Sequence, residues 1–344
     1  MIIPNTARQR VSVDENRSFM VPVELPELVV IDQEKKQLVF RMNQSRLQTY
    51  MGCSRAFMWK YVEDLDVGKP YIRMELGSGA HEGLAQLASG ASMDEAMKAA
   101  VARFKMEFRD EQMLPGEMEE IVAAEETLRK LLPAYVDHWG DQPFTPLGIE
   151  IGGQVTVGTV SIDGVSWECI IVFRLDKLVT FNQQIWIVDH KTAAKLDLRD
   201  VSKYAMDLQF TAYTYAATKL LQQQLPPGSP FEPRVQGVIV DMLVKTKVPQ
   251  FHRDIFPRTD AELTEFQYDW LGWCEVILRQ AVRGEQFISE GLPRRYAYPK
   301  NTKWCFYFGT CPYYNLCLKD TPQGRDLFVH RKMDYVETPA EKSV

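Results

Sequence analysis

The chain has 344 residues, of which 45% are hydrophobic and 25% charged, and its formal net charge is −6. This composition provides enough apolar material for a packed core and excludes a disordered chain. No apolar run is long enough to cross a bilayer and no secretory signal opens the chain, so we expect a cytoplasmic protein with no membrane partner.

The first part of the chain is predicted to be mainly helical. Two short strands are expected near residues 27–31 and 37–40, in a segment that is otherwise flexible or at a sheet edge. Helices are predicted over residues 45–62, 77–88, 92–108 and 115–138. Asn43 or Ser45 caps the first helix, which contains Cys53, and a Gly-rich turn opens the second. Ser92 and Glu95 form a capping box for the third.

The character of the chain then changes, because segments rich in Val, Ile and aromatic residues alternate with turn residues. Strands are predicted over 147–160, 165–179, 184–189, 235–244 and 250–256, and helices over 201–224 and 259–284. We expect one domain over residues 1–344, with a helical part (45–140), a catalytic sheet core (145–260), a cysteine segment (285–320) and a tail (321–344).

A hairpin is predicted with its turn at residues 182–183. In a symmetric antiparallel pairing about this turn, Asp176 lies opposite Asp189. Two carboxylates facing each other across a ladder repel unless a cation lies between them. Hard oxygen ligands suit magnesium or manganese, so the pair predicts a divalent metal site.

Alternation along the strand places Lys191 on the same face as Asp189, with His190 on the other face. A metal beside a lysine can polarise a phosphodiester, activate a water and offset the charge of the transition state. Taken alone, Asp-x-Lys is a very common triplet, and ordinary exposed charges on a surface hairpin are the simpler interpretation.

Three further residues are candidates for the same site. Gln209 and Tyr213 are four residues apart on a predicted helix, so they share one face and are suited to contact phosphates or bases of a single strand. His81 offers a nitrogen ligand. A half-buried helix surface and a structural histidine are the simpler alternatives.

Together, in chain order, these residues resemble the PD-(D/E)XK nuclease superfamily, in the branch of the RecB and AddB nuclease domains and the CRISPR-associated four-cysteine nucleases. The matching elements are Gly77 to His81, Asp176, Asp189 to Lys191, and Gln209 to Tyr213. The resemblance implies an α/β restriction-endonuclease-like core, in which helices flank a mixed central sheet and a helical insertion lies near the N-terminus. The run CIIVFRLD lacks the glycine that the family often has before its first aspartate.

The resemblance also implies roles for these residues. Asp176, Asp189 and Lys191 would be catalytic, and Gln209 and Tyr213 would line the DNA track. The metal ligands would be His81, Asp176, Asp189 and the carbonyl of His190.

Three cysteines lie close together near the C-terminus, Cys305, Cys311 and Cys317, and Cys53 makes a plausible fourth ligand. Four thiolates suit either tetrahedral zinc or an iron–sulfur cluster, and the spacing alone leaves both open. The remaining two, Cys169 and Cys274, are expected in the core. The resemblance favours a 4Fe-4S cluster that staples the two ends together, although five residues rather than two separate the first pair of the late group.

Basic residues gather in two late groups, the second of them interleaved with aromatic residues. The groups are Lys245, Lys247, Arg253 and Arg258, and then Arg294, Arg295, Lys300 and Lys303 with Tyr296, Tyr298 and Trp304. Such a mixture suits single-stranded DNA, with charge for the backbone and rings for the bases. A solvated charged face is the more common explanation.

We therefore expect a magnesium- or manganese-dependent DNA exonuclease that prefers single strands or ends and acts in recombination, repair or phage DNA processing. No phosphate loop of a motor is found in the sequence, so we expect either a small phage or plasmid enzyme or a subunit that works with a helicase or recombination partner. The cytoplasm would be that of a bacterium or of a phage-infected host. Two alternatives stay open: a catalytically silent DNA-binding or assembly factor, and a nuclease that trims ends for CRISPR adaptation.

Overall fold

The structure is a computed structural model that describes residues 8–14, 17–22, 29–32, 37–68, 70–108, 115–197, 201–223, 233–307 and 309–330. The predicted tail lies outside the described residues from position 331 onward. The chain divides into two compact units, each described by itself below. Unit 1 comprises Met1–Gly68, Gln154–Phe173 and Thr264–Val344, and unit 2 comprises Lys69–Gly153 and Arg174–Leu263. None of the described helices combines the length and apolarity needed to cross a membrane.

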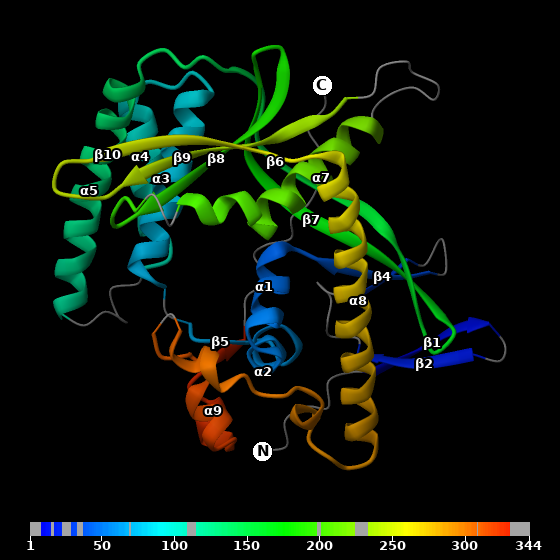
Figure 1. Cartoon of the computed structure of the whole chain (residues 1–344). Coiled ribbons are helices and arrows are strands. Elements are labelled where there is room, and N and C mark those ends of the chain that lie inside the picture. Colours follow the sequence, from blue (N-terminus) through cyan, green and yellow to red (C-terminus); the bar gives the residue numbers. More distant parts are fainter. Residues whose placement is uncertain are drawn as a thin grey trace. The chain divides into compact units, whose positions relative to one another are not determined.

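Unit 2 contains a mixed sheet (Figure 1). Its strands are the second half of β7 (Val165–Phe181), then β8 (Gln184–Ala193), β9 (Val235–Val244) and β10 (Gln250–Pro257). β7 and β8 form an antiparallel hairpin, β8 and β9 run parallel, and β9 and β10 are antiparallel. β9 is buried along almost its whole length, as expected for a Val- and Ile-rich strand between two neighbours with helices on both faces.

Helices cover this sheet. One group is α3 (Ile72–Ala88), α4 (Met93–Lys105) and α5 (Pro115–Trp139), which share a core with the β9 side chain Leu243. The other is α7 (Leu208–Gln223), which packs against β9 after a short 3₁₀ turn at Lys203–Met206. His190 lies beside the α5 ring of Tyr135, whereas its neighbour Lys191 reaches α7. Since side chains alternate along a strand, the two helix groups cover opposite faces.

The predicted hairpin register is confirmed. Pairs from Phe181↔Gln184 to Lys177↔Val188 keep the expected symmetry about the 182–183 turn, whose two residues have φ of 49° and 62°. The ladder ends at Lys177, one residue before Asp176, because the two strands separate there. The capping box of Ser92 and Glu95 is also confirmed.

The predicted Gly-rich turn at residue 77 is wrong, because α3 is already helical from Ile72. Its glycines serve close packing instead. A Cβ on Gly79 would lie 2.8 Å from the Ala100 carbonyl oxygen of α4, and one on Gly83 would lie 2.5 Å from Leu132 of α5. The glycines therefore let three helices approach one another closely.

Unit 1 contains the first half of β7, which pairs in parallel with β4, and β4 pairs antiparallel with β3. β6 (Thr145–Ile162), which belongs to this unit only from Gln154 onward, also pairs with β7. Two antiparallel pairs stand apart, β1 with β2 and β5 with β11. The strands of this unit are β1 (Arg8–Asp14), β2 (Arg17–Pro22), β3 (Val29–Asp32), β4 (Gln37–Met42), β5 (Leu65–Asp66) and β11 (Val329–His330). The β1–β2 hairpin was not predicted.

The helices of unit 1 include the long α8 (Asp260–Ser289), which buries Trp270 and Cys274. The others are α1 (Gln44–Gly52), α2 (Ser54–Phe57), a π-helical turn (Met58–Val62), 3₁₀ turns (Arg294–Ala297, Thr302–Phe306), α9 (Tyr314–Leu318) and α10 (Pro322–Arg325). Asn43, one of the two predicted caps, accepts a hydrogen bond from the Arg46 N–H. Cys53 interrupts the predicted helix with an extended backbone between α1 and α2.

Candidate functional site

The site in unit 2 begins where β7 and β8 separate. At this point a side chain of β7, and no longer its backbone, is the hydrogen-bond partner of β8. The Asp176 Oδ2 accepts a hydrogen bond of 2.7 Å from the backbone N–H of His190. The ring Nδ1 of His190 lies 3.3 Å from the same oxygen. One carboxylate oxygen thus lies against both the backbone N–H and the ring nitrogen of a single residue.

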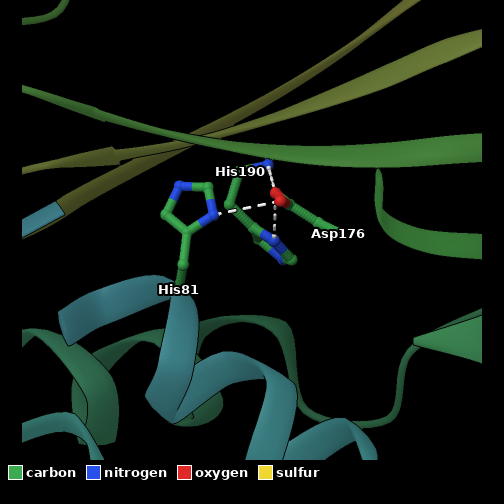
Figure 2. A group of neighbouring side chains, drawn as sticks. All are labelled: His81, Asp176 and His190. Carbon is green, nitrogen blue, oxygen red and sulfur yellow. Dashed lines mark hydrogen bonds and ion pairs between the residues drawn. The ribbon is translucent and has the colours of Figure 1, made fainter. Parts of the chain in front are cut away.

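His81 reaches this carboxylate from helix α3, with its Nδ1 3.1 Å from Asp176 Oδ1 (Figure 2). Each of His81, Asp176 and His190 offers one ligand atom, and these atoms all lie within 4.8 Å of one another. His81 Nδ1 and the Asp176 carboxylate are nitrogen and hard oxygen donors that fit a single transition-metal ion such as manganese. This is the one such group of three or more among the residues that the structure describes.

The electrostatics of the group fit a cation site. Burial alone would raise the pKa of Asp176, but the charge and hydrogen bonds of His81 and His190 hold it well below its usual range. Burial alone would lower the pKa of His81, but Asp176 raises it. Burial, together with the nearby Lys177, lowers the pKa of His190 to about 4. Asp176 is therefore an anion at neutral pH.

Asp189 lies on β8 beside this group and is only 2% exposed. Its Oδ1 is 2.6 Å from the Nζ of Lys191. Burial raises the pKa of Asp189 to about 6, against the opposing effect of Lys191, and the Asp176 charge raises it further. Although burial disfavours the ammonium, Asp189 raises the pKa of Lys191 above its ordinary value, so the lysine stays charged.

Gln209 and Tyr213 continue this arrangement on α7. The Gln209 Oε1 accepts a hydrogen bond of 3.1 Å from Lys191, and its Nε2 donates one of 3.0 Å to the Tyr213 hydroxyl. Burial raises the pKa of Tyr213 to about 12, with a further contribution from Asp189. The two residues predicted to contact DNA thus also hold Lys191 in place.

Two polar residues near the site had no signal in the sequence. Glu150 lies at the start of β6 with a φ of 51° and is ion-paired to Arg174 at 2.7 Å, and its pKa is raised by burial. Lys177 lies 3.5 Å from the Nε2 of His190. An isolated Glu or Lys in a strand belongs to no motif, and only the folded sheet places these two near Asp176.

The four predicted cysteine ligands line one small cavity in unit 1, together with the side chains of Asn301 and Trp304. The Asn301 backbone N–H donates to the Cys53 sulfur at 3.4 Å, and the Cys311 N–H donates to the Cys305 carbonyl at 2.8 Å. All the cysteines are unpaired thiols, and burial raises the pKa of Cys311. Cys169 and Cys274, which were predicted in the core, are both buried.

Several members of the two late basic groups have structural partners, and the contact of these groups with single-stranded DNA stays a prediction. The Arg253 guanidinium binds Asp241, and Arg258 is 3% exposed and donates to the carbonyl of Tyr204. Arg294 is ion-paired to two glutamates, and Tyr298 is fully buried. Lys245, Lys247, Lys300 and Lys303 are at least partly exposed.

The family model of the PD-(D/E)XK nuclease superfamily matches residues 41–318. Among solved structures, a candidate exonuclease from Eubacterium rectale is 17% identical, with a TM-score of 0.38 over 70% of this chain and 80% of that chain. Another, named SSO0001, is 9% identical, with a TM-score of 0.23 over 50% of this chain and 69% of that chain. No curated protein matches the sequence.

The family match spans both the carboxylate site and the cysteine segment, and the mixed sheet flanked by helices is the architecture expected for it. The chain therefore belongs to the PD-(D/E)XK nuclease superfamily.

Proposed function

We propose that the protein is a DNA exonuclease that hydrolyses phosphodiester bonds with magnesium or manganese. One observation supports the proposal most: His81 contacts Asp176 at the open end of the β7–β8 ladder, and Asp189, which is paired with Lys191, interacts electrostatically with both His81 and Asp176. Nucleases of this superfamily usually use divalent metal ions, and the donor set fits one.

In this proposal the metal is held by His81, Asp176, Asp189 and the carbonyl of His190. When bound, the ion would polarise the phosphate and lower the pKa of a water molecule. The raised pKa of Lys191 makes it a fixed cation rather than a proton acceptor. Its ammonium, held by Asp189 and Gln209, is placed to offset negative charge on the phosphate.

We propose DNA strand ends or single strands as the substrate, within recombination, repair or phage DNA processing. Tyr213 and Gln209 are half-buried beside Lys191, so each keeps some surface for a passing strand. A phenol and an amide offer a hydrogen-bonding and stacking surface that tolerates any base sequence.

We also propose that the four cysteines hold an iron–sulfur cluster. A single zinc with Zn–S bonds of about 2.3 Å brings thiolates to within roughly 3.8 Å of one another. Among the described residues, no three of these sulfurs form a group within 4.8 Å. A cubane separates its thiolates more widely because each binds a different iron, and the N–H donated to Cys53 suits a cluster thiolate.

The nuclease proposal is tested by degradation of end-labelled single-stranded DNA with manganese. The proteins are the wild type, Asp189→Ala, Lys191→Ala and, as a matched control, the exposed Lys130→Ala on α5. We expect both site variants to lose at least about a hundredfold in rate, since each removes charge from the site, and the control to match the wild type. Background-level products from all four proteins would instead favour a silent DNA-binding factor. A circular single strand, which offers no end, separates exonuclease from endonuclease action.

A further inference from the structure

The face of β8 opposite Asp189 carries a second set of polar groups that the proposed reaction does not use. His190 is 1% exposed, and its Nε2 lies 3.5 Å from the Nζ of Lys177 on β7. In the hairpin Lys177 opposes Val188, so it shares a face with His190, two residues along. The contact therefore follows from the register rather than from a chance approach of surface side chains.

The chemistry of this contact fixes where the proton of the His190 ring lies. An ammonium group has no lone pair and only donates, so Nε2 must accept from Lys177. The N–H of the neutral ring is then on Nδ1, which faces Asp176 Oδ2 at 3.3 Å. The opposite tautomer would leave two lone pairs, on Nδ1 and Oδ2, facing each other.

This hydrogen bond decides which oxygen of Asp176 remains available. Oδ2 accepts from both the backbone N–H and the ring of His190, at 2.7 and 3.3 Å, whereas Oδ1 faces His81. A carboxylate held in this way cannot rotate freely and offers a cation one oxygen rather than two.

Two carboxylates favour the charged form of Lys177. Burial lowers the pKa of Lys177, and the carboxylates of Asp241 and Asp176 oppose this effect. Asp241 lies beside His190 in the parallel β8–β9 register and is fully buried. Its Oδ2 accepts from Tyr135 at 2.5 Å and from Arg253 at 2.5 Å. A buried carboxyl side chain, held by Tyr135 and Arg253, thus lies on β9, across β8 from the strand of the lysine.

We propose that Lys177 is a positioning residue that holds the His190 ring in the Nδ1–H tautomer and so leaves only Oδ1 of Asp176 for the catalytic metal. This inference rests on the proposed function, because it assumes that Asp176 binds the metal. Lys177 touches neither the metal nor the substrate, and it acts through His190.

The test is manganese binding by calorimetry, without DNA, to the full chain. Lys177→Met removes the donor, Lys177→Arg keeps one, and the exposed Lys130→Met is the matched control. Outer residues of this kind typically change metal affinity by about 10- to 100-fold. We expect Lys177→Met to weaken manganese binding within that range, Lys177→Arg to recover most of the loss, and the control to bind like the wild type.

Repeating the Lys177→Met substitution in a His190→Asn protein shows whether Lys177 acts through the His190 ring. His190→Asn keeps an amide N–H near the position of Nδ1 and has no Nε2, so Lys177→Met should cost little further affinity in this variant. A merely structural role for Lys177 would give the same loss in both backgrounds and would overturn the proposal. Should Lys177→Met fail to fold, nitrogen chemical shifts of His190 in the wild type decide, because an Nε2–H tautomer excludes the proposed contact.

The outcomes separate the two proposals. If the wild type binds manganese and Lys177→Met binds it equally well, the positioning role is wrong and the nuclease proposal stands. If the wild type binds no manganese, the metal site itself is wrong and both proposals fall.

Discussion

At the scale of single residues, the site combines two aspartates with opposite electrostatic character. Asp176 has a pKa held well below its usual range by two histidines, whereas the pKa of Asp189 is raised to about 6 by its burial. The difference arises from partners: Asp176 accepts hydrogen bonds at the open end of the hairpin, and Asp189 is nearly sealed from solvent beside one lysine. The metal site therefore contains one permanent anion and one that titrates.

This difference predicts how metal affinity depends on pH. A carboxylate binds a metal only when it has lost its proton. Asp189 is ionised above its pKa of about 6, so its contribution to manganese affinity is fully present there and is lost as the pH falls below that value. We expect the dissociation constant to rise about tenfold per pH unit below pH 6, with His81, whose pKa is raised, adding to the slope.

Calorimetric titration of the wild type across this pH range measures the effect, with Asp189→Asn as the control. The amide does not ionise, so the part of the pH dependence that belongs to Asp189 should disappear, at the cost of weaker binding throughout. A dissociation constant that stays flat on both sides of pH 6 would contradict the assignment of Asp189 as a ligand.

At the scale of elements, strand predictions succeed where short-range chemistry determines structure. The hairpin register follows from its two-residue turn, and this alone brought Asp176 and Asp189 to the same end of the ladder. The approach of His81 depends on α3 crossing β8, where a Cβ on Gly77 would lie 3.3 Å from Thr192. Such a long-range contact leaves no local pattern, and the glycines of α3 taken by themselves indicate a turn.

The close packing of α3 predicts an unusual response to alanine. In an open helix position, Gly→Ala stabilises by about 1 kcal/mol. A Cβ at Gly79 would lie 2.8 Å from a backbone oxygen of α4, which cannot move without shifting that helix. Overpacking of this kind costs roughly 1–3 kcal/mol, so we expect Gly79→Ala to lower the free energy of unfolding measured with denaturant.

The matched control for this substitution is Gly116→Ala near the start of α5. A Cβ there meets nothing within 4 Å, so only the gain in helix propensity remains. We expect an unchanged or slightly higher denaturation midpoint. Equal stabilisation by both substitutions would mean that α3 and α4 do not approach as closely as described.

Two basic residues of unit 2 lie near each other, Arg73 at the start of α3 and Lys245 directly after β9. Lys245 follows β9, where its N–H donates to the Ala193 carbonyl at 2.8 Å, two residues beyond Lys191. Burial lowers the pKa of Lys245, and the positive charge of Arg73 lowers it further. Arg73 is one turn before Gly77 and two before His81, on the same side of the helix. Two like charges thus lie near each other in the same unit as the metal site.

Two neighbouring positive charges attract an anion, and the phosphates of a DNA substrate are anions. We expect Arg73→Gln and Lys245→Gln each to weaken binding of single-stranded DNA and to reduce the slope of log K against log salt concentration by about 0.7. The free energy of unfolding should not fall, because each change removes repulsion. Fluorescence anisotropy at several salt concentrations measures the slope, and the exposed Lys130→Gln should leave it unchanged.

At the scale of the whole molecule, the order of strands and helices was predictable, but the grouping of segments was not. The sequence predicts one domain over residues 1–344, and the contacts within the chain form two compact units. Unit 1 draws on the start, the middle and the end of the chain, and that grouping depends on contacts between residues about 250 positions apart. The hydrogen bond from Asn301 to the sulfur of Cys53 is one such contact, and Arg55 donating to the Tyr298 carbonyl at 2.6 Å is another.

The cysteine group was predictable because three of its members are close in sequence, whereas the burial of Arg294 and Tyr298 beside it was not. Arg294 and Tyr298 alternate with exposed positions in a loop-rich segment, which suggested a surface. They are instead buried against α8, where a Cβ on Gly284 would lie 3.1 Å from Arg294 and 3.3 Å from Tyr298. Charge and aromaticity without periodicity do not indicate which side chains face inward.

Cys53 lies far along the chain from Cys305, Cys311 and Cys317, so a cluster bound by all four would join the two ends of the chain. If the four thiols bind a cluster, its binding free energy contributes to the folding of unit 1. We expect protein purified without oxygen to be brown with about four irons per chain, and Cys311→Ala to lose the iron and the visible absorption.

Protease resistance of the terminal segments should fall in the same variant, because a ligand that binds only the folded state stabilises it. Cys274→Ala is the matched control, since Cys274 is a buried thiol on α8 outside the cavity and should keep the iron despite a loss of packing. Zinc with no visible absorption in the wild type would replace the iron–sulfur proposal with a tetrahedral zinc site. Retention of iron by Cys311→Ala would exclude Cys311 as a ligand in either case.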